Sequence, residues 1–142
     1  MTLLAAVLFL FAAQAPTSLD QVKADANPEH RARLAVDYAS LAERRAEAAY
    51  DAGNMEQVRA NLKEVVDSME LAKDSFVASG KKPGRSPGPY KYAEQHSLEL
   101  LIRLNDLGQK MDAGEREPLD GAKTQVQDIH DAWFEGIMGK SK

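Results

Sequence analysis

The sequence contains no cysteine among its 142 residues. Disulfide bonds, thiolate zinc sites, iron–sulfur clusters and cysteine nucleophiles are therefore excluded for this chain. No segment combines an alternation of apolar and polar residues with the valine, isoleucine and threonine content that is typical of β-strands. These two absences remove a large group of chemistries and indicate an all-helical protein.

A surplus of positive charge is also missing. Charged residues make up 28% of the chain, the formal net charge is −4, and the basic residues are spread among acidic ones. Proteins that bind nucleic acids usually carry a basic stripe or face. The charge distribution therefore predicts a protein that does not bind nucleic acid, and the length fits a single domain.

Long apolar runs are absent except near the N-terminus. The first fifteen residues carry no charged side chain, and an apolar run extends from Leu3 to Ala13. It ends in Ala13-Gln14-Ala15, the small-x-small pattern of a secretory cleavage site, although Pro16 shifts the expected cut by a residue or two. The run is shorter than the ~20 residues of a membrane span. We predict a signal peptide over residues 1–15, a periplasmic or secreted protein, and no integral membrane span after leader removal.

Four long segments repeat their apolar residues in alternating steps of three and four, the period of a helix that buries one face. We predict helices over residues 28–52, 54–79, 89–112 and 118–138. The inner faces of the last three are expected to be seams of Met55, Val58, Leu62, Val65, Met69, Ala72 and Phe76, then of Ala93, Ser97, Leu100, Leu104, Leu107 and Met111, and then of Leu119, Ala122, Val126, Ile129, Trp133 and either Gly136 or Ile137.

The first long helix differs from the others because it carries two adjacent apolar stripes. One consists of Leu34, Tyr38, Leu41 and Ala48, and the other of Ala35, Ala39, Ala42, Ala46 and Ala49. Two stripes predict neighbours on two sides, and a part left uncovered would be a surface for a second copy or a partner. The charged pairs Arg44-Arg45 and Glu43-Glu47 are interpreted as a solvated face.

The tripeptide Asp-Ala-Gly follows the first and the third predicted helix, at residues 51–53 and 112–114. Glycine readily leaves a helix in the left-handed conformation, so we predict a chain reversal through Gly53 and Gly114. Helices of about 24 residues are ~36 Å long. Four of them joined by short loops favour an up-down-up-down antiparallel bundle of two helical hairpins over residues 28–142. Residues 16–27 are predicted to be a short helix or a linker.

The loop "KKPGRSPGPYKY", residues 81–92, is the segment most typical of a binding site. Its prolines and glycines interrupt helix, and its cations and tyrosines form a predicted site for an anion, a lipid head group, a glycan or an acidic partner, namely Lys81, Lys82, Arg85, Tyr90, Lys91 and Tyr92. The alternative is a solvated crossover loop whose lysines interact with the end of the preceding helix. In that case both tyrosines pack the next helix against the core.

His96 and His130 are expected at similar heights in the bundle, and Asp128 and Asp131 lie beside His130 in the sequence. Helical bundles hold metal ions and haem between facing helices. A ligand-, metal- or haem-carrying bundle that uses these two histidines is therefore the alternative function. The Glu-x-x-His pairs of di-iron bundles are absent, and His130 follows the seam residue Ile129, which favours a structural role.

No catalytic arrangement is recognisable. The serines inside the predicted helices lack the Gly-x-Ser-x-Gly elbow of hydrolases, and paired carboxylates fall on solvated helical faces. We therefore predict no enzyme activity and no cofactor. The sequence predicts a small exported helical bundle that acts by protein–protein interaction or binding, with an unidentified partner protein or with a second copy of itself.

Overall fold

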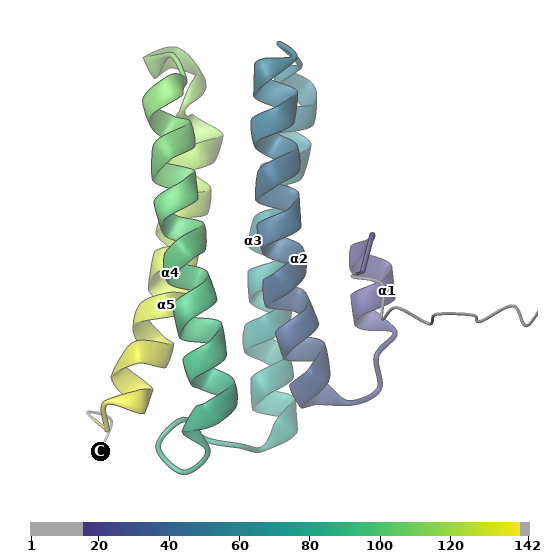
Figure 1. The fold of residues 1–142 in the computed structure, drawn as a ribbon, viewed down its shortest axis with the longest axis vertical. Helices are drawn as coiled ribbons and strands as arrows, with labels where there is room; N and C mark the ends of the chain where they lie inside the picture. The colour runs from purple at the N-terminus through teal and green to yellow at the C-terminus, as the bar shows by residue number, and fades with distance from the viewer. Residues whose placement is uncertain (1–15, 140–142) are drawn as a thin grey trace, which may run out of the picture.

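A computed structural model of the protein describes residues 16–139. It contains a short helix, α1 (Leu19–Lys23), and four long helices, α2 (Pro28–Asp51), α3 (Met55–Ser79), α4 (Pro87–Lys110) and α5 (Glu117–Ile137), with a 3-10 turn, η1 (Ala113–Glu115), before α5. Consecutive long helices run in opposite directions and pack together (Figure 1). The prediction of an all-helical protein built on four long helices is confirmed. The expected signal peptide, residues 1–15, lies outside the described residues.

Each long helix has two neighbours. Helix α2 packs against α3 and α4, and α5 packs against α4 and α3. The most extensive of these contacts joins α2 to α3. Small side chains explain it, because the alanines that α2 directs inward are completely buried and let the two backbones approach closely: Ala32, Ala35, Ala39, Ala42 and Ala46.

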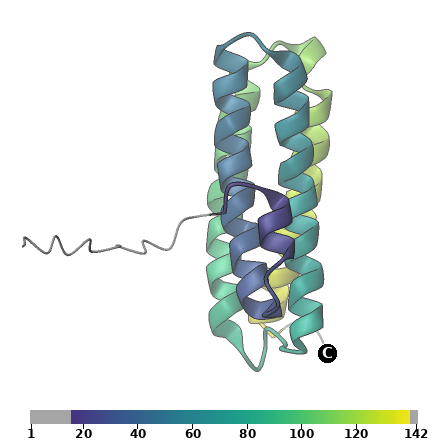
Figure 2. The ribbon, with the colours of Figure 1, turned by 90° about the vertical axis from the view of Figure 1, so that its right-hand side faces the viewer.

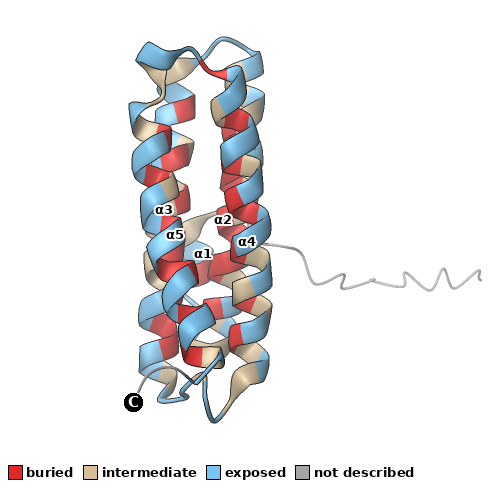
Figure 3. Cartoon of the chain, turned by 90° about the vertical axis from the view of Figure 1, so that its left-hand side faces the viewer, coloured by how far each residue is buried: buried red, intermediate tan, exposed pale blue. Residues whose placement is uncertain are grey.

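The interior is formed by the predicted seams, which face one another along the bundle (Figure 3). Every seam residue of the last three helices is buried except Met55 and Ile137, which are half-buried. Near the lower end, Trp133 packs edge-on against Phe76, with 5.5 Å between the ring centroids. Burial of each large side chain contributes about 1.5–3 kcal/mol to folding, so the seams are the main source of stability.

Helix α1 lies outside the bundle against α2 and α3 (Figure 2). The Ser18 hydroxyl caps it by accepting a hydrogen bond from the backbone N–H of Gln21 at 3.3 Å. The Gln21 side chain in turn accepts a hydrogen bond from the backbone N–H of Thr17, the residue before the cap, at 2.9 Å. Val22 is completely buried, which fixes α1 on this side of the bundle.

The first stripe of α2 is largely covered within the chain. Tyr38 is buried, Leu34 and Leu41 are half-buried, and only Ala48, near the end of the helix, is exposed. The structure therefore leaves little of this stripe open to a second copy or to a partner.

The two Asp-Ala-Gly turns have different conformations. Gly53 has a φ of 73°, as predicted, and its N–H donates to the Tyr50 carbonyl at 2.9 Å. The prediction of a left-handed Gly114 is wrong, since that residue lies within η1 and does not have a positive φ. The reason is that Met111 has already left α4 in an extended conformation, with φ −80° and ψ 143°, so the chain turns away before it reaches the glycine.

Helix α4 begins at Pro87, two residues before the predicted start. A proline at the first helical position loses no hydrogen bond, because the first N–H groups of a helix have no intrahelical partner. The same argument applies to Pro89, which still lies in the first turn. The other predicted helix boundaries are within two residues of those observed.

The contact between α5 and the α3–α4 loop gives a stability prediction. A Cβ atom added at Gly136 would lie 2.5 Å from Cγ of Pro83, whereas one at Gly121 would meet nothing within 4 Å. We expect Gly136→Ala to lower the free energy of unfolding by roughly 1–3 kcal/mol through overpacking. The control Gly121→Ala should raise it by about 1 kcal/mol, since alanine is the better helix former. Urea unfolding followed by circular dichroism measures both, and equal stabilisation by the two variants would contradict the close packing.

Candidate functional site

The predicted basic site lies at the lower end of the bundle in Figure 1, on the α3–α4 loop and the first turns of α4. The loop has a defined backbone. Gly80 ends α3 with a φ of 69°, and the Lys82 carbonyl accepts hydrogen bonds from the N–H groups of Arg85 at 3.1 Å and Ser86 at 2.8 Å. Together with the contact of Pro83 on Gly136, these bonds hold the loop in one shape.

Tyr90 is part of the core rather than of the exposed surface. It is 5% exposed, and its ring stacks on Phe76 with 4.2 Å between the centroids. Its hydroxyl donates a hydrogen bond to the Lys81 carbonyl at 2.7 Å, and burial raises the pKa of this hydroxyl. Tyr90 therefore attaches both the start of α4 and the preceding loop to the bundle.

Tyr92 is half-buried between α4 and α2. Its hydroxyl donates to the Asp37 carboxylate, and the Arg33 guanidinium lies 4.2 Å from its ring centroid. Burial, and then the hydrogen bond to Asp37, raises the pKa of the Tyr92 hydroxyl. Its interactions thus hold α4 against α2.

A cleft of about 380 Å³ lies beside Tyr92, between the first turns of α2 and α4. Its volume is within the range of small-molecule sites. Its polar lining is already engaged, however, because Glu29 pairs with Lys81 and His30 pairs with Asp25. The hydrogen bond from His30 is the main reason that the pKa of Asp25 is lowered. The cleft therefore offers few open polar groups to a ligand.

Three of the four cations in residues 81–92 are open to solvent. Lys82, Arg85 and Lys91 are exposed, and their side chains make no ion pair or hydrogen bond with any residue between 16 and 139. Lys81, by contrast, is paired with Glu29 at the start of α2. The structure thus divides the six predicted residues into three open cations, one paired cation and two packed tyrosines.

The structure places His96 and His130 on different sides of α4. His130 is 8% exposed; its Nε2 is 2.9 Å from Glu94 Oε1 on α4, and its Nδ1 is 3.0 Å from Asp131 Oδ1. The ring of His130 thus lies between Glu94 of α4 and Asp131 of its own helix. His96 instead lies against Tyr92 and lines a second cleft, between α2 and α4. Within the described part of the chain, no group of three His, Asp or Glu side chains is arranged to hold a metal ion.

Sequence reasoning missed the most unusual side chain of the bundle, Glu43. Its exposure is 0%, and neither carboxyl oxygen has a hydrogen-bond partner. The nearest cation is Nη1 of Arg103 on α4, 4.0 Å from Glu43 Oε2 and 3.7 Å from Glu47 Oε2. Burial first, and the charge of Glu47 second, raise the pKa of Glu43 to about 7.

The interpretation of residues 43–47 as a solvated face is therefore wrong for Glu43, although Arg44 and Arg45 are exposed. A signal for its burial does exist in the sequence. Glu43 follows the buried Val36 by seven residues and precedes Tyr50 by seven, so the helical period places all three on one face. The prediction placed Glu43 on the solvated face because its side chain is ionisable, although its spacing is that of a buried residue.

No known protein family matches this chain, and no curated protein or solved structure matches it either. None of the helices between residues 16 and 139 has an apolar stretch long enough to span a bilayer. The function must therefore be inferred from the residues of this chain.

The role of Tyr90 as an anchor gives a prediction. We expect Tyr90→Ala to lower the free energy of unfolding by about 3–5 kcal/mol, because it removes a buried aromatic ring and leaves a cavity against Phe76. The neighbouring exposed residue is a matched control, and Lys91→Ala should change stability by less than about 0.5 kcal/mol. Chemical denaturation of both variants measures these values. A similar loss in the two variants would show that Tyr90 does not anchor α4.

Proposed function

We propose that this protein is an exported helical bundle that binds an acidic segment of a partner protein at its loop end and catalyses no reaction. The observation that carries the proposal is the display of three cations, Lys82, Arg85 and Lys91, that no described side chain neutralises. Since the chain has a net charge of −4, this local excess of positive charge runs against its average. Export rests on the apolar leader pattern of residues 1–15 in the sequence.

The geometry favours an extended acidic partner over a small anion. A small anion is bound by donors that converge on one point, whereas these cations are distributed over a loop and the first turns of a helix. The loop is also held in shape before binding by Tyr90 and by the contact of Pro83 on Gly136. A rigid surface loses less conformational entropy on association, and exposed charges of one sign accelerate the encounter with an oppositely charged partner.

The acidic partner is either another protein or a second copy of this chain, which is itself net acidic. In both cases the bound group is an acidic protein segment. The experiment below distinguishes the two by identifying the chain that is captured. The absence of catalysis is proposed from the sequence, in which no nucleophile and base occur in a recognisable pattern. The polar contacts of the loop end add support, because the bond of Tyr92 to Asp37 and the pair of Lys81 with Glu29 hold parts of the bundle together.

Charge reversal at the loop end tests this proposal. A photoactivatable cross-linking residue at Ser86, beside the exposed cations, should capture a chain with an acidic contact segment in the native host. The substitutions Lys82→Glu, Arg85→Glu and Lys91→Glu together should reduce capture at least tenfold, because attraction becomes repulsion. The control variant Arg59→Glu with Lys110→Glu reverses two exposed cations on other parts of the bundle and should capture normally. Capture should also decrease as salt is raised.

The proposal fails if the loop variant and the control variant capture equally, or if the captured segment is not acidic. Mass spectrometry of the recovered chain tests export in the same sample, because a chain that retains Met1 contradicts removal of a leader. These two readouts are independent, so binding and export can fail separately.

An absorption spectrum distinguishes this function from the alternative of a metal- or haem-carrying bundle. Since His96 and His130 face different grooves, we expect the purified protein to show neither a Soret band nor a stoichiometric metal by elemental analysis. A Soret band or bound metal that disappears in both His96→Ala and His130→Ala would instead establish the carrier.

A further inference from the structure

Glu43 lies where the two helical hairpins meet, in the contact between α2 and α4. Among the described residues, the two carboxyl oxygens of Glu43 are the only buried polar side-chain atoms that lack a hydrogen-bond partner. An ionised carboxylate is far more costly to bury without partners than a protonated carboxyl group. The closed bundle therefore favours the protonated form of Glu43.

The charged groups that face Glu43 from α2 and α4 do not offset the cost of burying an ionised carboxylate. On α2 these are Glu47 and Arg44, and on α4 they are Arg103 and Asp106. Arg103 is the nearest cation, but it is shared with Glu47, lies slightly closer to it, and is 43% exposed. The two acidic neighbours repel a charge at Glu43.

The other two long helices contribute no polar partner from the interior. Every buried side chain of α3 from Val58 to Val65, and of α5 from Leu119 to Val126, is hydrophobic. These segments lie at the height of Glu43, because Tyr38 of α2 bonds to Glu64 of α3, and Asn105 of α4 bonds to Lys123 of α5. An ionised Glu43 can therefore regain solvation only if water enters between α2 and α4.

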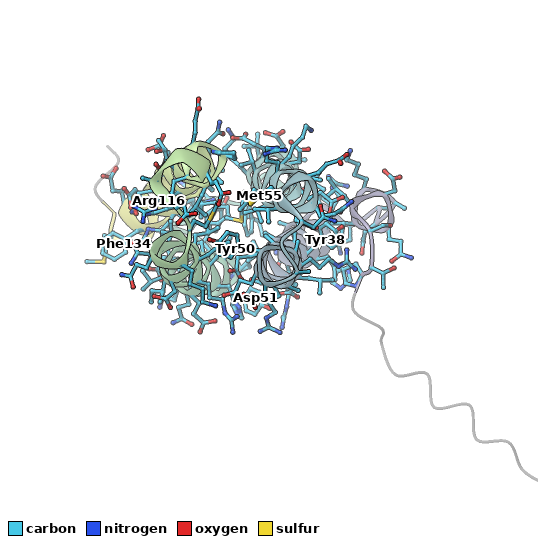
Figure 4. All side chains as sticks on the ribbon, turned by 90° about the horizontal axis from the view of Figure 1, so that it is seen from above. Tyr38, Tyr50, Asp51, Met55, Arg116 and Phe134 are labelled. Carbon is cyan, nitrogen blue, oxygen red and sulfur yellow. The ribbon has the colours of Figure 1, made fainter. Side chains whose placement is uncertain are left out.

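We propose that Glu43 is a proton-controlled joint between the two hairpins, with the upper part of the α2–α4 contact closed while this carboxyl group is protonated and open once it is ionised. Each hairpin keeps its own helix pair during opening. Few polar contacts hold α2 to α4 above Glu43: the ion pair of Arg103 with Glu47, and the hydrogen bond from the Tyr50 hydroxyl to the Lys110 carbonyl at 2.8 Å. Seen from above in Figure 4, Tyr50 lies between the two hairpins.

The lower part of the same contact is cross-linked further, because Lys81 of the adjoining loop pairs with Glu29 of α2. There the Tyr92 hydroxyl bonds to Asp37, and Arg33 lies over the Tyr92 ring. Opening is therefore expected at the end of the bundle that carries Gly53 and η1, away from the basic loop.

The pH window follows from the direction of the shift. The pKa of Glu43 is raised from 4.5 to about 7 by burial in the closed state, whereas the open state has an ordinary pKa. The closed form is fully favoured below pH 4.5, loses stability between pH 4.5 and 7, and loses no more from this group above pH 7. A shift of this size changes the equilibrium between closed and open forms by roughly three-hundredfold.

The absence of native cysteine makes a direct distance measurement straightforward. Spin labels on Ala48→Cys in α2 and Gln109→Cys in α4, both exposed near the upper end, report the separation of the hairpins. Pulsed electron paramagnetic resonance should give one short distance at pH 5. At pH 8.5 a longer distance should appear, with a population at least tenfold greater than at pH 5.

Two substitutions remove the proton switch in different ways. Glu43→Gln keeps the shape without the charge, and Glu43→Leu removes the polar group, so both should keep the short distance at pH 8.5. If the amide variant does not fold, the leucine variant still tests the joint. The control Glu135→Gln removes an exposed carboxylate on α5 and should behave like the parent protein.

Two outcomes would overturn the inference. One is a label distance in the parent protein that does not change with pH. The other is an opening that persists at pH 8.5 in Glu43→Leu, because the carboxylate would then not be its cause. Denaturant unfolding completes the test: a pH-dependent loss of stability that Glu43→Leu abolishes, without any change in label distance, would show that the charge weakens the whole fold and opens no joint.

Discussion

The close packing of α2 on α3 is the interaction on which the rest of the bundle depends. It is possible because α2 places alanines where the other helices place leucine, methionine or tryptophan. Two backbones brought together by small side chains leave the larger residues of α4 and α5 to fill the remaining interior. The bundle is thus asymmetric, with a tight first hairpin and a second hairpin that supplies most of the bulk. The buried carboxyl of Glu43 lies on the side of α2 that faces this second hairpin.

The two ends of the bundle differ in how firmly the hairpins are joined. At the loop end, Tyr90, Tyr92 and the contact of Pro83 with Gly136 connect elements that are distant in the sequence. At the other end, a single hydrogen bond from Tyr50 and a partly exposed ion pair connect α2 to α4 among the described residues. The proposed binding surface is thus on the rigid end and the proposed joint toward the weaker end, so a partner on the basic loop would leave the joint free to respond to protons.

The sequence alone predicts the helices and their inner faces, because both depend on nearby residues. The apolar period lies within each helix, and residues such as Gly80 and Pro118 mark helix ends. It was insufficient where two local signals compete. Gly114 was predicted to turn the chain, but Met111 had already done so. Glu43 has the spacing of a core residue and the chemistry of a surface residue, and only the packing of α4 over it settles the matter. The separation of the loop into open cations and packed tyrosines likewise depends on Phe76 and Asp37, which are distant in the sequence.

The attachment of Tyr90 to the main chain of Lys81 has a consequence for how this protein can diverge. A carbonyl group is present whichever residue occupies position 81, so the bond does not constrain the side chains of the loop. Substitutions at positions 82 and 85 can change which surfaces are recognised while the scaffold is retained. The side chains of this short segment can therefore change recognition, while its main-chain carbonyl at position 81 keeps the architecture.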